Sequence, residues 1–382
     1  MELINQMTEK NSIVFINQNA GYLMIDIINA HEHYKERSII AGKLVSRNNL
    51  LDKAVKFENI ITYNRTSSLK RLFTWVWGFI QILWLVKTRY RKSELFIVTN
   101  PPFAVFLPLF CPNKYSVLVY DVYPDVLSAY NYFKKDSFIA RMWSKANRKI
   151  FLNAQSVFTI SEGMKRSLCK YAAPEKIEVV PLWADNSFLK PVEKNKNIFI
   201  EQYNLQGKFL IIYSGNLGHS HSVEILVEIA DAVKDYDIFF IIIGEGDKKQ
   251  LISSLIKSKG LENFLLLPLQ PVEMLPYTLS AADLAVVTLG KEASAFSVPS
   301  KTFSLLSVGA PLLCIADVQS ELASLVDHYQ AGKCFHTAEL EKIISFIHSV
   351  KSDKNYHAAL KQNAINASKE FGPKNAFKFV TS

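Results

Sequence analysis

The sequence is poor in cysteine and in long apolar runs, and both shortages exclude classes of protein. Its 382 residues include four cysteines, Cys111, Cys169, Cys314 and Cys334, without the spacing of a metal-binding motif. Cys111 and Cys314 lie in apolar runs, so we expect them to be buried free thiols in a reducing compartment. The first residues, MELINQMTEKNS, contain no apolar signal region, which argues against secretion and for a cytoplasmic protein.

Motifs of several enzyme classes are also missing. No nucleophile elbow or Ser/His/Asp order is present, so hydrolase chemistry has no support. The glycine turns do not form the Gly-x-Gly-x-x-Gly pattern of dinucleotide binding. His219 and His221 stand beside a glycine turn, but no carboxylate or cysteine completes a metal-ligand set. We therefore expect neither a metal nor a bound cofactor.

Charge is unevenly distributed along the chain. Residues 1–200 hold 28 Lys and Arg against 16 Asp and Glu, a balance of +12, whereas the remaining residues hold 16 against 19, a balance of −3. A basic first half suits a polyanionic partner or a membrane surface, or it is simply a lysine-rich solvated face. Nucleic acid is not an expected partner because the basic residues form no recognised binding motif.

Residues 69–92, LKRLFTWVWGFIQILWLVKTRYRK, are the most apolar segment and are flanked by basic residues. The apolar centre, 73–86, has 14 residues, fewer than the ~20 that span a bilayer. The tryptophans and flanking cations are typical of an interfacial anchor at the inner face of a membrane. A core helix of an α/β domain would also be apolar, and the two interpretations are compatible if only one face is buried.

Short β-branched runs alternate with helical patterns in two series. The first runs from NSIVFINQ to KIEVVPL, the second from KFLIIYSGNLG to APLLCIAD, and the polar segment 182–198 separates them. Such alternation predicts parallel, doubly wound sheets, hence an α/β fold of two Rossmann-like domains. We expect domains at 1–190 and 191–370, with a helix at 371–382 packing back toward the first domain.

Three turns that connect strands to helices in the second half are candidate anion sites. The first, YSGNLGHSHS, includes Gly215, Asn216 and His221, with Ser222 as the expected N-cap of the next helix. The second, IIIGEGD, includes Gly244 and Gly246 around Glu245, which either accepts hydrogen bonds from a ligand or only caps the turn.

The third turn, SVPSKTFSLLSVGAP, places Ser300 or Pro299 at a helix start and Lys301 in the first turn. A lysine there does not stabilise a helix, because the N-terminus already carries partial positive charge. An anion bound at this position explains the lysine, and three converging turns suit a diphosphate.

The second half resembles the C-terminal domain of family 4 glycosyltransferases of the GT-B fold. The resemblance rests on YSGNLGHSHSVEIL, FFIIIGEGD, LPLQPVEMLPYTLSAADLAVV, VPSKTFSLLSVGAPLL and the glycine turn AGKCF, which keep their order over about 130 residues. The Pro-Ser-Lys form is similar to that of enzymes building bacterial capsule, O-antigen and exopolysaccharide. YDVYPDV, VFTISEGMKRSL and VVPLWADNSF extend a looser resemblance into the first half.

This resemblance implies two domains facing each other across a central cleft. It further implies a retaining transfer of a hexosyl or N-acetylhexosaminyl group from a nucleotide sugar, with UDP as the expected nucleotide, to a glycan acceptor. Residues Gly215, Asn216, His221, Ser222, Gly244, Glu245, Gly246, Ser300 and Lys301 are the expected donor site, and Gly21, Asp121 and Asp125 the expected acceptor side. Asp121 and Lys301 are the expected catalytic pair, although Asp121 is also explained as a cap after its strand.

Some family positions differ in this chain. Phe296 and Ser304 occupy the two acidic positions of the family's Glu-x7-Glu motif, and Asn216 and His221 replace its usual Arg and Lys. The site is then either weakened or specialised for its donor, or the protein is a pseudo-enzyme.

A lipid-diphosphate-linked acceptor would explain the basic first half and the 69–92 segment together. The expected protein is thus a cytoplasmic glycosyltransferase, peripheral to the inner membrane, of bacterial surface polysaccharide biosynthesis. The alternatives are a GT-B sugar-nucleotide epimerase and a non-catalytic nucleotide-sugar-binding subunit of a glycan assembly complex.

Overall fold

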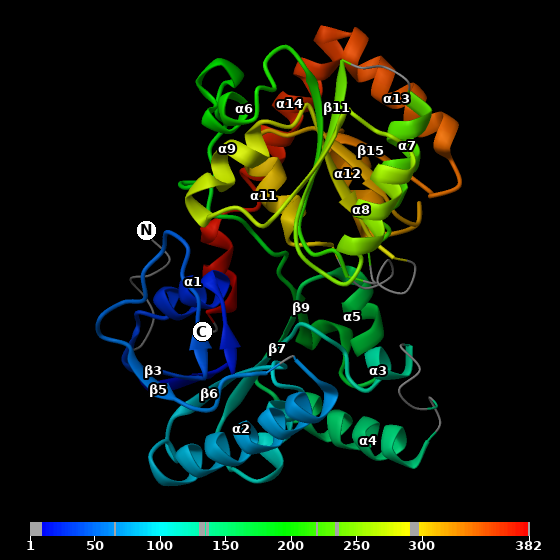
Figure 1. Ribbon diagram of the computed structural model, residues 1–382. Helices are drawn as coiled ribbons and strands as arrows, with labels where there is room; N and C mark the ends of the chain where they lie inside the picture. Colours follow the sequence, from blue (N-terminus) through cyan, green and yellow to red (C-terminus); the bar gives the residue numbers. More distant parts are fainter. Residues whose placement is uncertain are drawn as a thin grey trace. The chain divides into compact units, whose positions relative to one another are not determined.

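The computed structural model describes residues 10–64, 66–129, 134, 137–218, 221–233, 237–290 and 298–380. The chain divides into two compact units: Met1–Pro181 with Lys374–Ser382, and Leu182–Pro373 (Figure 1). Residue 190, the boundary expected from the sequence, falls inside the second unit.

The first unit is built on a seven-stranded parallel sheet of order β5-β3-β1-β6-β7-β8-β9. Two further short strands, β2 (Asn19–Ala20) and β4 (Lys43–Leu44), pair separately. The seven strands are β1 (Lys10–Ile16), β3 (Tyr34–Ala41), β5 (Lys56–Asn59), β6 (Glu94–Val98), β7 (Tyr115–Val119), β8 (Val157–Thr159) and β9 (Ile177–Val179).

Helices connect these strands, as the alternating sequence pattern predicts. They are α1 (Tyr22–Ala30), α2 (Ser68–Thr88), η2 (Pro102–Leu109), α3 (Asp125–Ala129), α4 (Phe138–Asn153), α5 (Glu162–Leu168) and η3 (Pro174–Lys176). The last helix along the chain, η6 (Pro373–Phe379), also packs here, because the Phe379 ring lies 5.0 Å from that of Phe158 and 6.2 Å from that of Phe96.

The second unit has a six-stranded parallel sheet of order β12-β11-β10-β13-β14-β15. Counted along the chain this order is 3-2-1-4-5-6, in which the direction of winding reverses between β10 and β13. Ligands of such sheets bind beside the carboxyl ends of the strands at this reversal. The strands are β10 (Phe209–Ser214), β11 (Ile238–Ile243), β12 (Phe264–Leu267), β13 (Leu284–Thr288), β14 (Leu312–Ile315) and β15 (Gly332–Phe335).

The helices of the second unit are longer toward its C-terminal end. They are η4 (Lys194–Lys196), α6 (Ile198–Gln202), α7 (Ile225–Val233), α8 (Lys249–Ser258), η5 (Val272–Met274), α9 (Leu275–Ser280), α11 (Lys301–Ser307), α12 (Glu321–Tyr329), α13 (Leu340–Ser352) and α14 (Lys354–Ser368).

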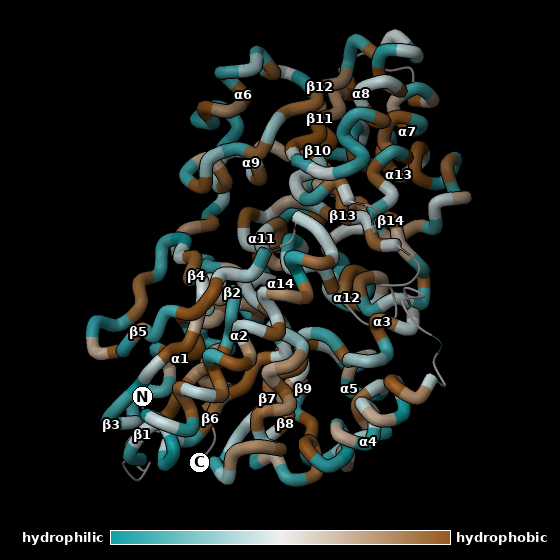
Figure 2. Tube along the Cα trace, turned by 60° about the horizontal axis from the view of Figure 1, so that its bottom comes forward, coloured by the Kyte–Doolittle hydropathy of each residue, from teal (hydrophilic) through white to brown (hydrophobic). Residues whose placement is uncertain are grey.

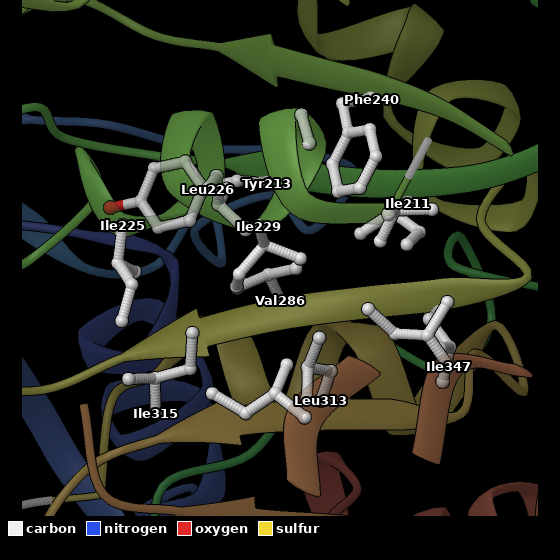
Figure 3. Close-up of a cluster of buried hydrophobic side chains, with 14 of the residues drawn as sticks. Ile211, Tyr213, Ile225, Leu226, Ile229, Phe240, Val286, Leu313, Ile315 and Ile347 are labelled. Atoms are coloured by element: carbon white, nitrogen blue, oxygen red, sulfur yellow. The ribbon is translucent and has the colours of Figure 1, made fainter. Parts of the chain in front are cut away.

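Apolar side chains from the strands and from α7 and α13 form the core of the second unit. Figure 3 shows Ile211, Phe240 and Val286 of the sheet together with Leu226 of α7 and Ile347 of α13. Strand β11, IFFIII, is apolar along its whole length and is brown in Figure 2. Continuous apolar strands are typical of parallel sheets with both faces covered.

The structure corrects the sequence-based prediction at one strand of the second sheet and confirms it for two cysteines. The stretch AGKCF is not only a glycine turn, because Gly332–Phe335 form the edge strand β15 beside β14. Cys111 and Cys314 are buried free thiols, as predicted.

Candidate functional site

Lys301, the first residue of α11, inserts its side chain beneath the turn that follows β10. Its Nζ atom lies 3.7 Å from the centroid of the Tyr213 ring. The Tyr213 hydroxyl in turn donates a hydrogen bond to the carbonyl oxygen of Asn216 (2.7 Å). A residue predicted from one turn therefore contacts the neighbouring turn through an aromatic ring.

Glycine at position 215 is required by this arrangement. Its φ is +154°, and a Cβ atom there would lie 2.7 Å from the Lys301 Nζ atom. Any larger residue would push the lysine away from its place over Tyr213.

The Lys301 ammonium is buried without a hydrogen-bond partner in the described part of the chain. Burial lowers the pKa of Lys301 from its ordinary value of 10.5 to about 7. The face of the Tyr213 ring offsets part of this desolvation, since a cation is attracted to an aromatic quadrupole. A bound anion would complete the pairing and restore the charged form.

The second glycine turn is locked against the first. A Cβ atom on Gly244 would lie 2.1 Å from the Gly215 carbonyl oxygen, so only glycine permits this approach. The Gly215 N–H donates to the Ile243 carbonyl (2.9 Å), and the Leu217 N–H donates to the Glu245 carbonyl (2.9 Å). These backbone bonds hold the exits of β10 and β11 as one rigid surface.

Gly246 and Glu245 complete this second turn in different ways. Gly246 has φ +151°, and a Cβ atom there would lie 2.6 Å from the Leu217 carbonyl carbon. The Glu245 carboxylate pairs with the Lys249 ammonium of α8 at 2.6 Å. Glu245 thus has a protein partner, in an exposed pair that leaves its second oxygen available.

His221 connects the first turn to the end of β13. Its Nδ1 atom lies 3.0 Å from the Thr288 carbonyl oxygen, which is a hydrogen bond when Nδ1 carries the proton. Burial lowers the pKa of His221, and the charges of Lys301 and Lys248 lower it further. The imidazole is therefore neutral at neutral pH, with Nε2 as an acceptor in that tautomer.

The predicted N-cap role of Ser222 is wrong. Helix α7 begins at Ile225, and the first turn is closed by the Leu226 and Val227 N–H groups donating to Val223 and Glu224. The two residues after Ser222 form a turn before the helix, which displaces the helix start from the serine.

Lys248 is a residue of this region that the sequence did not single out. Its ammonium donates to the His221 carbonyl (2.8 Å) and pairs with Glu224 (2.8 Å). It fixes the loop that carries His221. In the sequence, only its position directly after the GEGD turn indicates that Lys248 belongs to this region.

Ser300 and Ser304 lie on either side of Lys301. Ser300 precedes α11 in a helical conformation, and its side chain makes no capping hydrogen bond. Ser304 is buried within α11, so this acidic position of the family motif holds a small side chain inside the fold. Phe296, the other position of that motif, lies outside the described residues, as does His219.

In the first unit, Gly21 follows the short strand β2, and Asp121 lies two residues after the end of β7. Gly21 precedes α1, and a Cβ atom there would meet no atom within 4 Å. The Asp121 N–H donates to the Thr99 Oγ1 atom (3.4 Å). Desolvation raises the pKa of Asp121 above its usual range, a shift that its exposed position limits.

Asp125, the third residue predicted on the acceptor side, has protein partners. Its carboxylate forms an ion pair with Lys170 and accepts a hydrogen bond from the Tyr171 hydroxyl (3.0 Å). These contacts fasten α3 to the segment after α5. They explain Asp125 without a ligand.

Metal ligands do not assemble in the part of the chain that the structure describes. Within those residues, no group of three or more His, Cys, Asp or Glu side chains is placed to hold an ion.

The second unit resembles a known protein family over most of its length. Residues 195–367, less than half of the chain, match the family model described as glycosyl transferases group 1. The resemblance predicted from the motifs of the second half is confirmed.

Two curated relatives carry names from polysaccharide biosynthesis. The putative colanic acid biosynthesis glycosyl transferase WcaI of Escherichia coli (strain K12) is 27% identical over 213 residues, which cover 55% of this chain and 52% of that protein. The probable glycosyltransferase WbjE of Pseudomonas aeruginosa is 27% identical over 260 residues, covering 64% of this chain and 63% of that protein. The alignments therefore span less than two thirds of either relative's length.

The fold is shared with solved structures over nearly the whole chain. Anabaena Alr3699/HepE, solved in complex with UDP and glucose, superposes with a TM-score of 0.72 and 16% identity. The match covers 97% of this chain and 98% of that one. The predicted fold class, GT-B with two Rossmann-like domains, is confirmed.

Proposed function

We propose that this chain is a retaining glycosyltransferase of bacterial surface polysaccharide biosynthesis. It transfers a hexosyl or N-acetylhexosaminyl group from a nucleotide sugar, with UDP as the nucleotide, to a glycan acceptor. The names of the two curated relatives and the UDP complex of the Anabaena protein support the class of reaction and of donor.

The buried ammonium of Lys301, which has no hydrogen-bond partner among the residues that the structure describes, is the observation that carries the proposal. It lies where the winding of the second sheet reverses, beneath glycine turns that exclude side chains. A lysine without a counter-ion at such a position is a site prepared for a negative group. The diphosphate of a nucleotide sugar supplies that group.

Transfer breaks the bond between the anomeric carbon and the diphosphate oxygen. The acceptor hydroxyl oxygen forms the new bond on the same face of the sugar that the diphosphate leaves, so that configuration is retained, and the hydroxyl proton passes to the departing diphosphate. Lys301 stabilises the negative charge that develops on the leaving group, a form of electrostatic catalysis that requires no metal. The neutral His221 and the backbone of Asn216 complete the donor surface.

The acceptor side of the proposal rests on Asp121 and Gly21. A Cβ atom at Gly21 would meet no atom within 4 Å, which suits an approaching acceptor, and Asp121 would orient the acceptor hydroxyl. Asp125 is assigned a structural role, because Lys170 and Tyr171 already occupy its carboxylate.

A lipid-diphosphate-linked acceptor and peripheral attachment to the inner membrane through residues 69–92 complete the proposal. The +12 balance of residues 1–200 supports an anionic partner, and α2 keeps large apolar side chains exposed. The protein would then work on the cytoplasmic side, where nucleotide sugars are available.

Calorimetric titration of UDP, GDP, TDP and ADP into the wild type and Lys301→Ala tests the donor assignment. UDP should bind the wild type, and the variant should lose at least tenfold in affinity, about 1.4 kcal/mol. Lys301→Arg is the matched control for charge. It keeps the positive charge, although the guanidinium fits the space over Tyr213 less well than the ammonium. Equal affinity in the wild type and Lys301→Ala would contradict the assignment.

A non-catalytic nucleotide-sugar-binding subunit is the second candidate, favoured by the buried Ser304 at a position where the family carries an acid. It predicts UDP binding without product from any acceptor. A sugar-nucleotide epimerase would instead interconvert the donor without acceptor. A turnover assay with and without acceptor separates these outcomes from transfer.

A further inference from the structure

Helix α2 has two faces with opposite environments. Thr74, Gly78, Ile82, Leu85 and Val86 are buried against the first unit. The other face holds large apolar side chains that remain exposed, and Trp77 and Trp84 keep 46% and 57% of their surface. The sequence left open whether this helix is buried in the core or exposed at the surface. In the structure one face of the helix is buried and the other is exposed.

The exposed apolar residues recur at helical spacing, so they form one stripe. They are Leu69, Leu72, Phe73, Val76, Trp77, Ile80 and Trp84. Soluble surfaces rarely carry a contiguous row of this kind, and such a row marks a site of interaction.

The stripe does not end with α2. Helix η2 packs on α2 through the rings of Phe79 and Phe110, 6.1 Å apart, and it leaves Leu109 and Phe110 exposed. On its other side η2 packs on α4, with the Phe106 ring 5.3 Å from that of Trp143.

Helix α4 extends the same kind of surface. It exposes Phe138, Ile139 and Met142, three apolar side chains of its first turns. Figure 1 shows α2 and α4 along the same lower side of this unit. We call these exposed residues of α2, η2 and α4 the apolar face.

Helices α2 and α4 both carry basic residues and contain no acidic ones. Residues 68–92 contain six Lys and Arg and no Asp or Glu. Helix α4 contains Arg141, Lys145, Arg148 and Lys149, again without an acid. Arg89 pairs with Glu58 (2.9 Å), and the other basic residues leave an excess of positive charge beside the apolar side chains. Such a combination complements an anionic phospholipid surface.

We infer that the apolar face, formed by α2, η2 and α4, is an interfacial binding surface for an anionic phospholipid bilayer. The inference deepens the proposed attachment through 69–92, and it rests on that part of the proposed function. It adds η2 and α4 to the contact and assigns the selection of lipid to these basic residues.

Helix α2 is the one described helix that is long and apolar enough to cross a membrane, by length and composition alone. Its packing argues for lying in the interface instead. The Gln18 amide donates to the Thr74 carbonyl (2.8 Å), and a Cβ atom on Gly78 would lie 2.6 Å from that amide nitrogen. If α2 crossed the bilayer, its buried face would have to separate from the rest of the first unit. Insertion into the interface uses only the face that is already exposed.

The test is flotation of the purified full chain with vesicles of phosphatidylcholine, with and without phosphatidylglycerol. The wild type should float with the anionic vesicles and release at high salt. Leu72→Glu on α2 and Met142→Glu on α4 should each weaken binding by at least about tenfold. Lys145→Glu should weaken binding to anionic vesicles by a similar factor.

Matched controls come from the second unit. Leu251 is as exposed as Leu72 (50% and 49%), and Leu269 as exposed as Met142 (59% and 58%). Leu251→Glu, Leu269→Glu and the exposed Lys257→Glu should bind vesicles as the wild type does. Circular dichroism confirms that each variant is folded.

Three results would overturn the inference. They are absence of flotation, equal flotation with zwitterionic vesicles, and equal loss in the control variants. A dimer in light scattering that Leu72→Glu dissociates, without flotation, would assign the face to a second copy. UDP titration of the same variants separates this test from the proposed function, because the substitutions on α2 and α4 lie in the first unit and Lys301 lies in the second.

Discussion

The Lys301 ammonium lies 3.7 Å from the centroid of the Tyr213 ring, close enough to Gly215 that an added Cβ atom would approach it to 2.7 Å. The glycine, the aromatic ring and the lysine therefore depend on one another. Binding of a negative group beside this lysine would change its protonation.

UDP binding should take up protons above neutral pH. The pKa of Lys301 is about 7 in the ligand-free protein, so at pH 8 most molecules carry a neutral amine. The bound diphosphate favours the ammonium and raises that pKa, which draws a proton from the buffer. Titration at pH 8 in two buffers of different ionisation enthalpy measures the uptake. Lys301→Arg should show none, because arginine stays charged. Identical enthalpies for the wild type in both buffers would refute this prediction.

The ligand-free protein should gain stability as pH rises from about 7 toward 10.5. Lys301 has a lower pKa in the folded chain than its ordinary 10.5, so between these values the unfolded chain binds more protons. The free energy of unfolding therefore rises with pH in this window and loses this dependence below it. Lys301→Met should flatten the rise and be more stable at pH 7 by about 1 kcal/mol or more. Urea unfolding of the wild type and Lys301→Met at several pH values checks this prediction. The same pH dependence of the free energy of unfolding in both proteins would contradict the burial of the charge.

Gly244→Ala should be far more damaging than Gly260→Ala. The added Cβ atom at 244 would lie 2.1 Å from the Gly215 carbonyl oxygen and force the two turns apart. Gly260 has φ +61° but open space around it, so alanine there costs only backbone strain, about 1 kcal/mol. Urea unfolding should show a loss of about 3 kcal/mol or more at 244, accompanied by loss of UDP binding. A similar, small loss at both positions would show that the turns separate easily.

Asp121→Asn should affect sugar transfer, whereas Asp125→Asn should affect stability. Asp121→Asn should keep UDP affinity and stability but lower sugar transfer by at least about tenfold, because the acceptor hydroxyl loses its charged partner. Asp125→Asn should keep transfer but lose about 1 kcal/mol of stability with its ion pair to Lys170. Parallel titration, unfolding and transfer assays compare the two. Transfer unaffected in Asp121→Asn would remove that residue from the mechanism.

The strands that the sequence predicted best are those with continuous β-branched runs. Strand β11, IFFIII, is apolar throughout, so its assignment needs no tertiary information. Strand β15, GKCF, was missed, because a glycine and a lysine in four residues leave no apolar pattern. Its strand character comes from pairing with β14, which brings together residues distant in sequence.

The sequence predicted those parts of the site that depend on residues close together in the chain. Gly215 and Gly244 stand in glycine turns after strands, a pattern that a single sequence displays. The contact of Lys301 with Tyr213 joins the first residue of α11 to strand β10, and it could not be predicted because the two residues are far apart in the sequence. The start of α7 at Ile225 was misplaced, because Ser222 is a good N-cap in isolation and the intervening turn is set by tertiary contacts.

The contribution of Lys374–Ser382 to the first unit bears on the order in which the protein is made. Phe379 lies against Phe96 and Phe158, yet the ribosome adds it only after every residue of the second unit. The second unit is contiguous along the chain and can fold while synthesis continues, whereas the first waits for a late segment to fill its core. Until then the rings of Phe96 and Phe158 lack the contact that Phe379 provides.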